Sequence, residues 1–281
     1  MEQPLIEEGR LNAGGREIET SKPLRLSLTS FARSFAPPVV ALAVAVGLWE
    51  AWVRLRGVPE YLVPAPSAIA QRLAEDPAFF ARQGEITLYG ALAGFALGST
   101  VAILLAVAMA HSRFLERSLF PLAIMVKVTP IVAIAPLLAV WFGFGLAPKL
   151  FIIALIVFFP VMVNAVIGLR SVDPWALQYL QSLAASRWEI LVKLRLPSSL
   201  PYLFAAFKVS IPLSVIGAVV AEWFSGDQGL GRVIQVANSN VDMPTAFAAI
   251  VSLAVMGIAL YFVVALAERR LLSWHESAIE T

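Results

Sequence analysis

The chain contains six long apolar stretches, and three of them, residues 86–110, 150–169 and 245–267, carry no charged side chain. About 20 apolar residues in a helix rise about 30 Å, which is the thickness of the hydrocarbon core of a bilayer. Hydrophobic residues make up 59% of the chain and charged residues 14%, whereas soluble domains hold about 45–50% and about 25%. We therefore expect an all-α integral membrane protein with about six transmembrane helices.

The other three apolar stretches are each interrupted by ionised side chains. An ion within the hydrocarbon core costs free energy and usually faces a cavity or a partner, so each of these charges needs a structural explanation. The stretches are residues 36–53 with Glu50, residues 118–142 with Lys127, and residues 200–223 with Lys208 and Glu222.

Lys and Arg residues beside the spans predict the orientation of the chain, because basic residues near span ends are retained on the cytoplasmic side. If the N-terminus is cytoplasmic, thirteen of the 21 Lys and Arg residues lie in cytoplasmic segments, six, among them Lys149, lie in outer segments, and two lie within spans. This bias predicts that both termini are cytoplasmic. The cytoplasmic segments are residues 1–35, 111–117, 170–195 and 269–281.

One membrane domain is expected, because stacked apolar spans need no separate soluble core. The first 35 residues contain five basic side chains and no apolar run, which is unlike a cleaved signal peptide and typical of a cytoplasmic tail. We predict a cytoplasmic tail over residues 1–35, a transmembrane domain over residues 36–270 and a second cytoplasmic tail over residues 271–281.

Several classes of chemistry lack their residues in this sequence. The chain has no Cys and only two His residues, His111 and His275, so no catalytic residue, disulfide framework or metal site is expected. No Gly-Lys pair occurs, so the P-loop that wraps nucleotide phosphates is missing. The net charge of +2 is mild, and we expect no nucleic-acid partner.

A charged island, LAASRWEILVKLRLP at residues 183–197, lies within the longest internal cytoplasmic loop, about residues 171–200. Apolar residues recur at helical spacing on both sides of Ala184. Ser186 and Glu189 have the spacing of a capping box, in which each residue binds the backbone N–H of the other. The pattern predicts two short helices that are separated near Ala184.

The second of these helices is expected to end at Pro197 and Pro201. Proline lacks the backbone N–H that a helix interior needs, and it disfavours helical geometry in the residue before it. The chain would then turn back into the bilayer. The patterning is equally compatible with an amphipathic helix pair that lies on the lipid headgroups.

The loop resembles the EAA loop of ABC importer permeases, whose usual form is Glu-Ala-Ala, three residues, Gly, nine residues, Ile, one residue and Leu-Pro. Its second half matches closely through Leu194, Leu196 and Pro197. Its first half departs, because Gln178 begins the triplet in place of Glu and Ala184 replaces the Gly. An Ala at this position requires the bend to avoid a positive φ angle or to tolerate its cost.

Four further stretches look like the permeases that import nitrate, sulfonates, taurine or vitamin precursors, so the resemblance covers about residues 36–270. It implies the all-α fold of a type I ABC importer, in a bacterial-type plasma (inner) membrane, with several spans and no enzyme activity of its own. The stretches are residues 61–73, 133–150, 158–170 and 221–231.

The resemblance also implies partners and a role for residues 171–200, which we call the coupling loop. A second copy of this chain, two cytoplasmic ABC ATPase subunits, an extracytoplasmic substrate-binding protein and membrane lipid would surround it. ATP and Mg would bind the ATPase, so no cofactor is expected in this chain. The residues expected to couple the permease to the ATPase are Gln178, Ala184, Ala185, Ser186, Arg187, Trp188, Glu189, Lys193, Leu194 and Pro197.

Trp188 is the expected anchor of that contact, because a buried aromatic side chain at the centre of an interface often contributes about 2 kcal/mol or more. Arg187, Glu189 and Lys193 would form weaker ion pairs at the rim. The alternative for Trp188 is a position among the headgroups, where Trp is enriched.

Polar residues and prolines within the spans are candidates for lining a translocation path. Lys127 would attract an anionic or carbonyl-bearing solute, although its side chain could also snorkel to the cytoplasmic surface. The polar residues could equally form hydrogen bonds between helices, the prolines could be kinks, and Glu222 could be an interfacial carboxylate. The candidates are Lys127, Thr129, Pro130, Pro136, Asn164, Ser210, Ser214 and Glu222.

Gly90, Gly94 and Gly98 lie on one face of a predicted helix, at a spacing that lets membrane helices approach closely. Packing within the chain explains this spacing more simply than packing against gating helices. Lys208 has a position in its span similar to that of Lys127, and the alternative for it is a contact with lipid headgroups.

The expected function is import of a small polar nutrient. The sequence of residues 127–149 and 158–170 looks more like permeases for thiamine-precursor pyrimidines or riboflavin-like heterocycles than like those for nitrate or sulfonates. An aliphatic sulfonate, taurine, nitrate or bicarbonate is the alternative within the family. An ion-gradient-driven secondary transporter is the alternative from another class, although its intramembrane carboxylates are missing, and an intramembrane enzyme lacks a catalytic constellation.

Overall fold

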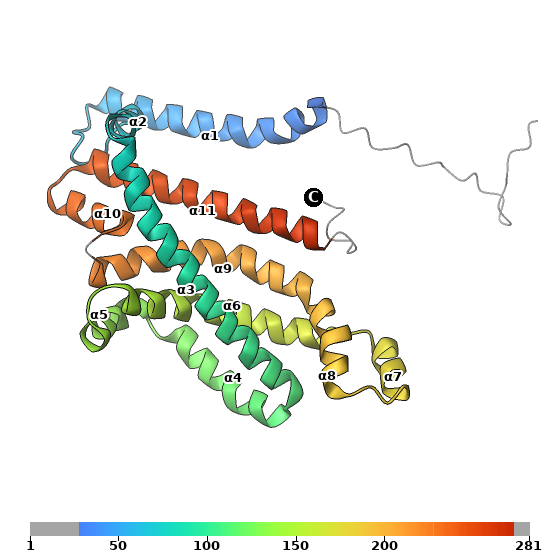
Figure 1. Ribbon diagram of the computed structural model, residues 1–281. Coiled ribbons are helices and arrows are strands. Elements are labelled where there is room, and N and C mark those ends of the chain that lie inside the picture. The colour runs from blue at the N-terminus through green and yellow to red at the C-terminus, as the bar shows by residue number, and fades with distance from the viewer. Residues whose placement is uncertain (1–27, 227, 273–281) are drawn as a thin grey trace, which may run out of the picture. The chain divides into compact units, whose positions relative to one another are not determined.

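The computed structural model describes residues 28–226 and 228–272, and every regular element in those ranges is helical (Figure 1). The prediction of an all-α chain is confirmed. Most of the two predicted tails, residues 1–27 and 273–281, lies outside the described residues. The elements are α1 (Leu28–Arg56), α2 (Pro66–Glu75), α3 (Pro77–His111), α4 (Arg113–Val128), α5 (Ile131–Phe142), α6 (Leu146–Arg170), α7 (Pro174–Ser182), α8 (Arg187–Ile190), the π-helical turn η1 (Leu191–Arg195), α9 (Leu196–Ser225), α10 (Leu230–Ser239) and α11 (Met243–Leu271).

The chain divides into two compact units, Met1–Ala51 and Trp52–Thr281. The first unit contains most of α1, a long apolar helix that accommodates Pro37 and Pro38 within its first half. The second unit contains the end of α1 and all the other described helices. The functional regions described below belong to the second unit.

Five described helical segments are long and apolar enough to cross a membrane, and α4 and α5 meet the same test together as a bent pair, which gives six spans when the pair is counted as one. The axes of α4 and α5 differ by 97°. Pro130 lies at the break, where its missing N–H and its restriction of the preceding residue favour a helix boundary. The expected number of spans is confirmed, and the span expected over residues 118–142 is two helices rather than one.

The core of the second unit is formed by α3, α6 and α9, with α11 packed against α9 (Figure 1). The helices α7 and α8 lie beyond one end of this bundle, and α10 lies at the other end. Small and branched aliphatic side chains fill the core, among them Ala91, Ala102, Ala106, Ile153, Val157, Ala165, Val215 and Ala218.

Gly90, Gly94 and Gly98 form the face of α3 that contacts α6. A Cβ atom at position 94 would lie 2.5 Å from the Cβ atom of Ile153, and one at position 98 would lie 2.7 Å from the carbonyl oxygen of Ala154. Both distances are shorter than atoms tolerate, so only glycine permits this approach of the two helices. The expectation of packing within the chain is confirmed.

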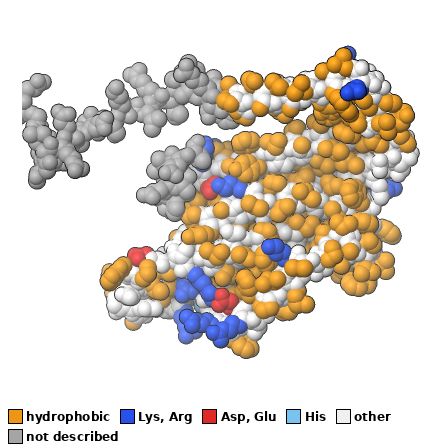
Figure 2. Space-filling view, turned by 180° about the vertical axis from the view of Figure 1, so that it is seen from behind, with side chains coloured by type: hydrophobic (Ala, Val, Ile, Leu, Met, Phe, Trp, Pro, Cys, Tyr) orange, Lys and Arg blue, Asp and Glu red, His pale blue; other side chains and the backbone are white. Residues whose placement is uncertain are grey.

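The surface reflects the membrane environment. Figure 2 shows a face on which hydrophobic side chains predominate, while Lys and Arg side chains gather towards the end of the bundle where α7 and α8 lie. Hydrocarbon solvates the apolar side chains, whereas the basic side chains near the span ends stay in water.

Replacement of Gly98 by Ala is expected to lower the free energy of unfolding by about 1–3 kcal/mol, because the added methyl group meets backbone atoms of α6 that cannot rotate away. Gly257→Ala is the matched control: Gly257 also lies within a long helix, but a Cβ atom there meets nothing within 4 Å. Chemical unfolding in detergent micelles measures both variants. Equal stability of the two would contradict the close approach at Gly98.

Candidate functional site

The coupling loop folds into two short helices, as the sequence predicts. Asp173 caps α7 by accepting hydrogen bonds from the N–H groups of Trp175 and Ala176 at 3.1 and 3.3 Å. Ser186 and Glu189 form the expected capping box of α8: the Glu189 N–H donates to the Ser186 hydroxyl at 3.2 Å, and the Ser186 N–H donates to the Glu189 carboxylate at 2.9 Å. These caps fix where each helix begins.

The bend between α7 and α8 tolerates a strained residue. Ala184 has a φ angle of +54°, in the left-handed region that L-residues with a Cβ atom rarely occupy. The N–H groups of Ala184 and Ala185 donate to the carbonyls of Gln181 and Leu180, at 3.0 and 3.1 Å, and hold the turn. The bend therefore does not avoid the positive φ angle that a glycine would take at lower cost.

The second helix does not end at Pro197 and Pro201, which corrects the expectation from sequence. It continues from α8 through η1 into α9 and forms one helical segment, Arg187–Ser225. In η1 the Leu196 N–H donates to the carbonyl of Leu191, five residues earlier. Pro197 then lies in the first turn of α9, where a missing N–H costs little.

The coupling loop carries exposed aromatic and apolar side chains, which we call together its aromatic surface. Trp188 is 70% exposed, and Trp175, Tyr179 and Leu183 are also exposed. Large apolar side chains in this number are unusual on a surface that is expected to face water. Of the other coupling residues, Gln178, Ala184, Ser186, Arg187, Lys193 and Pro197 are exposed, and Ala185, Glu189 and Leu194 are half-buried.

The charges of the island fall into two groups. Glu189 and Lys193 form an ion pair at 3.4 Å within one helix, beside the aromatic surface. Arg195 instead points into the bundle, where its Nη1 donates to the carbonyl of Ala110 at 3.0 Å. The island is therefore partly an anchor to the end of α3.

Arg170 provides a second tie at the same end of the bundle. Its guanidinium donates to both carboxylate oxygens of Glu116 on α4, at 2.5 and 2.6 Å, and to the carbonyl of Met109 at 3.4 Å. Arginine side chains suit the terminal carbonyls of α3, because those carbonyls lack partners within the helix and carry partial negative charge. The ends of α3, α4, α6 and η1 are thus joined.

At the opposite end of the bundle, Glu222 is fully buried. Its carboxylate forms an ion pair with the ammonium of Lys149 on α6 and accepts hydrogen bonds from the Thr87 hydroxyl at 3.1 Å and the Gly231 N–H at 2.8 Å. The expectation of an interfacial carboxylate is therefore wrong. Lys149, assigned to the outer flank from sequence, is only 6% exposed and is the partner.

Backbone groups after α9 complete this buried network. The Gly229 N–H donates to the side chain of Gln83 at 2.6 Å, and the Leu230 N–H donates to Thr87 at 2.9 Å. A Cβ atom at Gly231 would lie 2.9 Å from Glu222 and 2.8 Å from the backbone of α9, so this glycine lets the loop fold onto the carboxylate. The glycines of residues 221–231 are the sequence feature that could have indicated a tightly folded loop beside Glu222. They do not identify Lys149 as the partner of Glu222.

Two of the candidate path residues, Lys127 and Thr129, lie together beside the break between α4 and α5. They line a hollow of about 310 Å³ with Phe159, and the Lys127 ammonium lies 4.7 Å from the centre of the Phe159 ring. The Thr129 hydroxyl donates to the carbonyl of Met125 at 2.8 Å. Pro130 links the two helices at this point.

The remaining candidates lie elsewhere. Pro136 is exposed on α5, and Asn164 donates to the carbonyl of Pro160 in its own helix at 2.8 Å. Ser210 and Ser214 are buried within the bundle; Ser214 donates to the carbonyl of Ile211, and the Ser210 hydroxyl has no hydrogen-bond partner. The structure therefore brings only part of the predicted set together.

Lys208 has a protein partner. Its ammonium lies 2.7 Å from the carboxylate of Glu268 near the end of α11, and this ion pair satisfies both charges. The alternative that Lys208 meets lipid headgroups is wrong.

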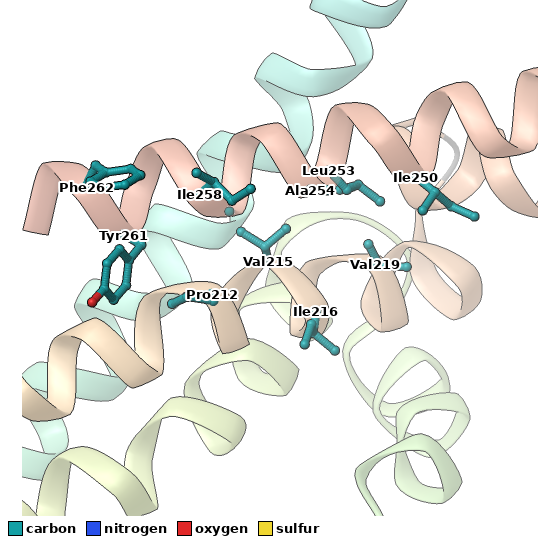
Figure 3. Close-up of a pocket in the computed structure, with 11 residues that line it drawn as sticks. Pro212, Val215, Ile216, Val219, Ile250, Leu253, Ala254, Ile258, Tyr261 and Phe262 are labelled. Carbon is teal, nitrogen blue, oxygen red and sulfur yellow. The ribbon is translucent and has the colours of Figure 1, made fainter. Parts of the chain in front are cut away.

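A hollow of about 660 Å³ lies between α9 and α11 in the second unit (Figure 3). Its wall is aliphatic and aromatic, with the Tyr261 hydroxyl as its polar side-chain group. It offers apolar contact and no chemistry, so size alone does not mark a functional site.

Comparison with known proteins is consistent with these features. A family model described as "Binding-protein-dependent transport system inner membrane component" matches residues 98–273. The riboflavin transport system permease protein RibX of Chloroflexus aurantiacus is 35% identical over 85% of this chain and 90% of that protein. The formylaminopyrimidine transport permease protein ThiX of Halalkalibacterium halodurans is 30% identical over 85% and 96%. The putative aliphatic sulfonates transport permease protein SsuC of Bacillus subtilis is 31% identical over 84% and 86%.

Solved structures show the same fold. A chain of the MetNI methionine ABC transporter, in inward-facing conformations, superposes with a TM-score of 0.57 at 16% identity, over 69% of this chain and 95% of that chain. A chain of an amino acid ABC transporter with histidines gives a TM-score of 0.55 at 16% identity, over 71% and 97%. At this identity the likeness establishes the fold alone.

Disruption of the buried ion pair is expected to destabilise the outer end of the bundle. Glu222→Gln and Lys149→Met should each lower the free energy of unfolding by about 3–5 kcal/mol, because each leaves the other charge buried without its counter-ion. The double variant should lose less than the sum of the two. Chemical unfolding of all three variants in detergent tests this, and strictly additive losses would argue against the pair.

Ala184→Gly is expected to stabilise the coupling loop by about 0.5–1 kcal/mol, because relief of the left-handed strain exceeds the added entropy of glycine in the unfolded chain. Ala185→Gly, next to it but without a positive φ angle, should destabilise the loop by about the same amount. Hydrogen exchange of the loop amides measures both effects. A loss of protection in Ala184→Gly would contradict the strained geometry.

Proposed function

We propose a function from the premise that this chain belongs to the family of binding-protein-dependent transport system inner membrane components: it is the multi-pass permease subunit of an ATP-driven importer. The sequence contains no P-loop, so the energy source is a separate ATPase chain. The full assembly contains two copies of this permease, two cytoplasmic ABC ATPase subunits and an extracytoplasmic substrate-binding protein.

The observation that carries this proposal is the form of the coupling loop. It carries the exposed side chains of Trp188, Trp175 and Tyr179, and its second helix runs without a break into the span α9. An ATPase that binds this surface would hold a rigid extension of a transmembrane helix. We assign Trp188 as the central anchor, with Arg187 and Gln178 beside it.

Movement of α8 would reach the rest of the bundle through specific contacts. It passes directly along η1 to α9, and through Arg195 to the end of α3. The ion pair between Lys149 and Glu222 joins α6 to α9 at the outer end. The permease then alternates between outward- and inward-open states, and the ATPase shifts the population because it binds one state better.

The proposed orientation rests on the distribution of basic residues. The coupling loop faces the cytoplasm, and both termini lie on that side. The loop after α9 and the helix α10 then face outside, where the substrate-binding protein delivers its solute. This orientation agrees with the distribution of Lys and Arg in the sequence.

The transported solute is a small polar nutrient, and a vitamin-precursor heterocycle is our first assignment. Two relatives support this assignment, because RibX is named as a riboflavin transport permease and ThiX as a formylaminopyrimidine transport permease. An aliphatic sulfonate, taurine, nitrate or bicarbonate is the alternative within the family, and SsuC supports a sulfonate. An ion-gradient-driven carrier fits less well, because each Glu within the described spans lies in the first or last nine residues of its helix.

Trp188→Ala is expected to uncouple ATP hydrolysis from uptake. Loss of an interface anchor of this kind costs about 2 kcal/mol or more of binding, which is roughly a thirtyfold loss of affinity between permease and ATPase. Copurification of the ATPase and ATP-dependent uptake into proteoliposomes, with the substrate-binding protein present, measure the two consequences. Trp188→Phe should retain part of both.

Trp141→Ala is the matched control, since Trp141 on α5 is also 70% exposed but lies outside the coupling loop. It should leave ATPase binding unchanged. Uptake by the wild-type permease without any ATPase would contradict the proposed function, and equal loss of ATPase binding in both variants would contradict the role of Trp188.

A further inference from the structure

The ammonium of Lys127 lies midway along the length of the bundle rather than at either end, on the exposed flank of the single chain. Its contact, Phe159, lies on α6 eleven residues before Arg170, at the end of that helix, a distance of about 16 Å along the helix axis. Half the hydrocarbon core is about 15 Å thick. A side chain that snorkels to the headgroups would leave the Phe159 ring, so the structure places this cation at the depth of the membrane centre.

No carboxylate neutralises this cation within the described part of the chain. Ion pairs that involve spans join Lys149 to Glu222, Arg170 to Glu116 and Lys208 to Glu268. In each pair the carboxylate belongs to one of the four residues at an end of its helix. A second copy of the chain would bring the same described carboxylates at the same depths, so it would not supply a counter-ion at the centre. A cation in hydrocarbon that has only an aromatic face as partner is incompletely compensated.

The hollow beside Lys127 lies where the helical backbone is interrupted between α4 and α5. The axes of α4 and α5 differ by 97° there, and α5 begins at Ile131 without a side-chain cap. Thr129 and Ile131 line the hollow with Phe159 and Pro160. Irregular backbone at membrane depth is tolerated where it is buried in protein or lines a water-filled cavity. At about 310 Å³ the hollow lies at the small end of the range of ligand sites, about 300–1,000 Å³.

We propose that this hollow is an intramembrane binding site for the transported solute, and that it selects small solutes with an anionic or carbonyl oxygen that accepts a hydrogen bond from Lys127. The inference rests on the proposed function for the identity of the ligand as a transported solute. Phe159 holds the ammonium when no solute is present. When the solute enters, Lys127 exchanges the ring for the oxygen, which is the stronger partner in a site of low dielectric constant.

The absence of cysteine from the sequence allows a direct test that does not depend on transport. Thr129→Cys places a single thiol of this chain at the hollow, in the assembled transporter in proteoliposomes. The probes are an anionic reagent, (2-sulfonatoethyl) methanethiosulfonate, and a cationic reagent, 2-(trimethylammonium)ethyl methanethiosulfonate. The anionic reagent should react about tenfold faster than the cationic one, because a charged cleft concentrates ions of opposite sign.

Two further variants complete this test. In Thr129→Cys/Lys127→Met the preference for the anionic reagent should disappear. Ile258→Cys is the matched control, since Ile258 lies at the middle of α11 in the apolar hollow of Figure 3, and it should react slowly with both reagents. Failure of Thr129→Cys to react with either reagent, or an anionic preference that survives Lys127→Met, would overturn the proposal.

Uptake measurements then connect the site to the solute. Radiolabelled riboflavin, formylaminopyrimidine and taurine are first tested with the wild-type assembly. The solute that it takes up is then used for the variants. Lys127→Met should lower uptake about tenfold or more, whereas Lys127→Arg retains the donor and should lose much less. The midpoint temperature of thermal unfolding of Lys127→Met should not be lower than that of the wild type, because the change removes a charge from the membrane interior.

The outcomes separate this inference from the proposed function. If Lys127→Met takes up the solute as fast as the wild type does, the proposed site is wrong, but the proposed function as an importer is not affected. A Lys127→Met variant that unfolds would show that the cation is structural, and would also overturn the site. Failure of the wild-type assembly to import with its ATPase would count against the proposed function, while the labelling result would still report on the hollow.

Discussion

The close approach of α3, α6 and α9 is the constraint on which the rest of the second unit depends. Helices in a bilayer gain little from the hydrophobic effect when they associate, so they need surfaces that fit at short range. Gly94 and Gly98 provide this fit against Ile153 and Ala154. Gly90 belongs to the same face, but it lies against the side chain of Lys149. The glycine face therefore packs the helices and also makes room for the buried cation that pairs with Glu222.

Charged groups tie the bundle at its two ends, and they leave the middle apolar except for Lys127. Arg170 and Arg195 bind the last carbonyls of α3 at the end where the coupling loop lies, where both side chains are partly exposed and each bond costs little desolvation. At the outer end the pair of Lys149 and Glu222 is shielded from water, so its stability depends on the hydrogen bonds that surround it. A bundle tied in this way would tilt as a body when α8 moves.

The sequence predicts the features that depend on neighbours along the chain, and it misses those that depend on distant residues. The capping box of Ser186 and Glu189 and the glycine face of α3 are local patterns with one common structural solution. Nothing local relates Lys149 to Glu222 or Lys208 to Glu268, because each pair is made only when separate spans pack. The continuation of the helix past Pro197 was missed for another reason: a wider π turn removes the conflict that a regular α-helix would have at a proline.

The break between α4 and α5 limits what can lie beside it. Lys127, Thr129 and Pro130 are all exposed in the single chain, yet lipid cannot satisfy a cation or the backbone groups of a broken helix. Water or protein must therefore cover this face in the membrane. The proposed second copy would meet both needs if the two breaks faced each other across a water-filled space, because each chain then shields the other from lipid. On this argument the translocation path would run between the two copies along α4 and α5.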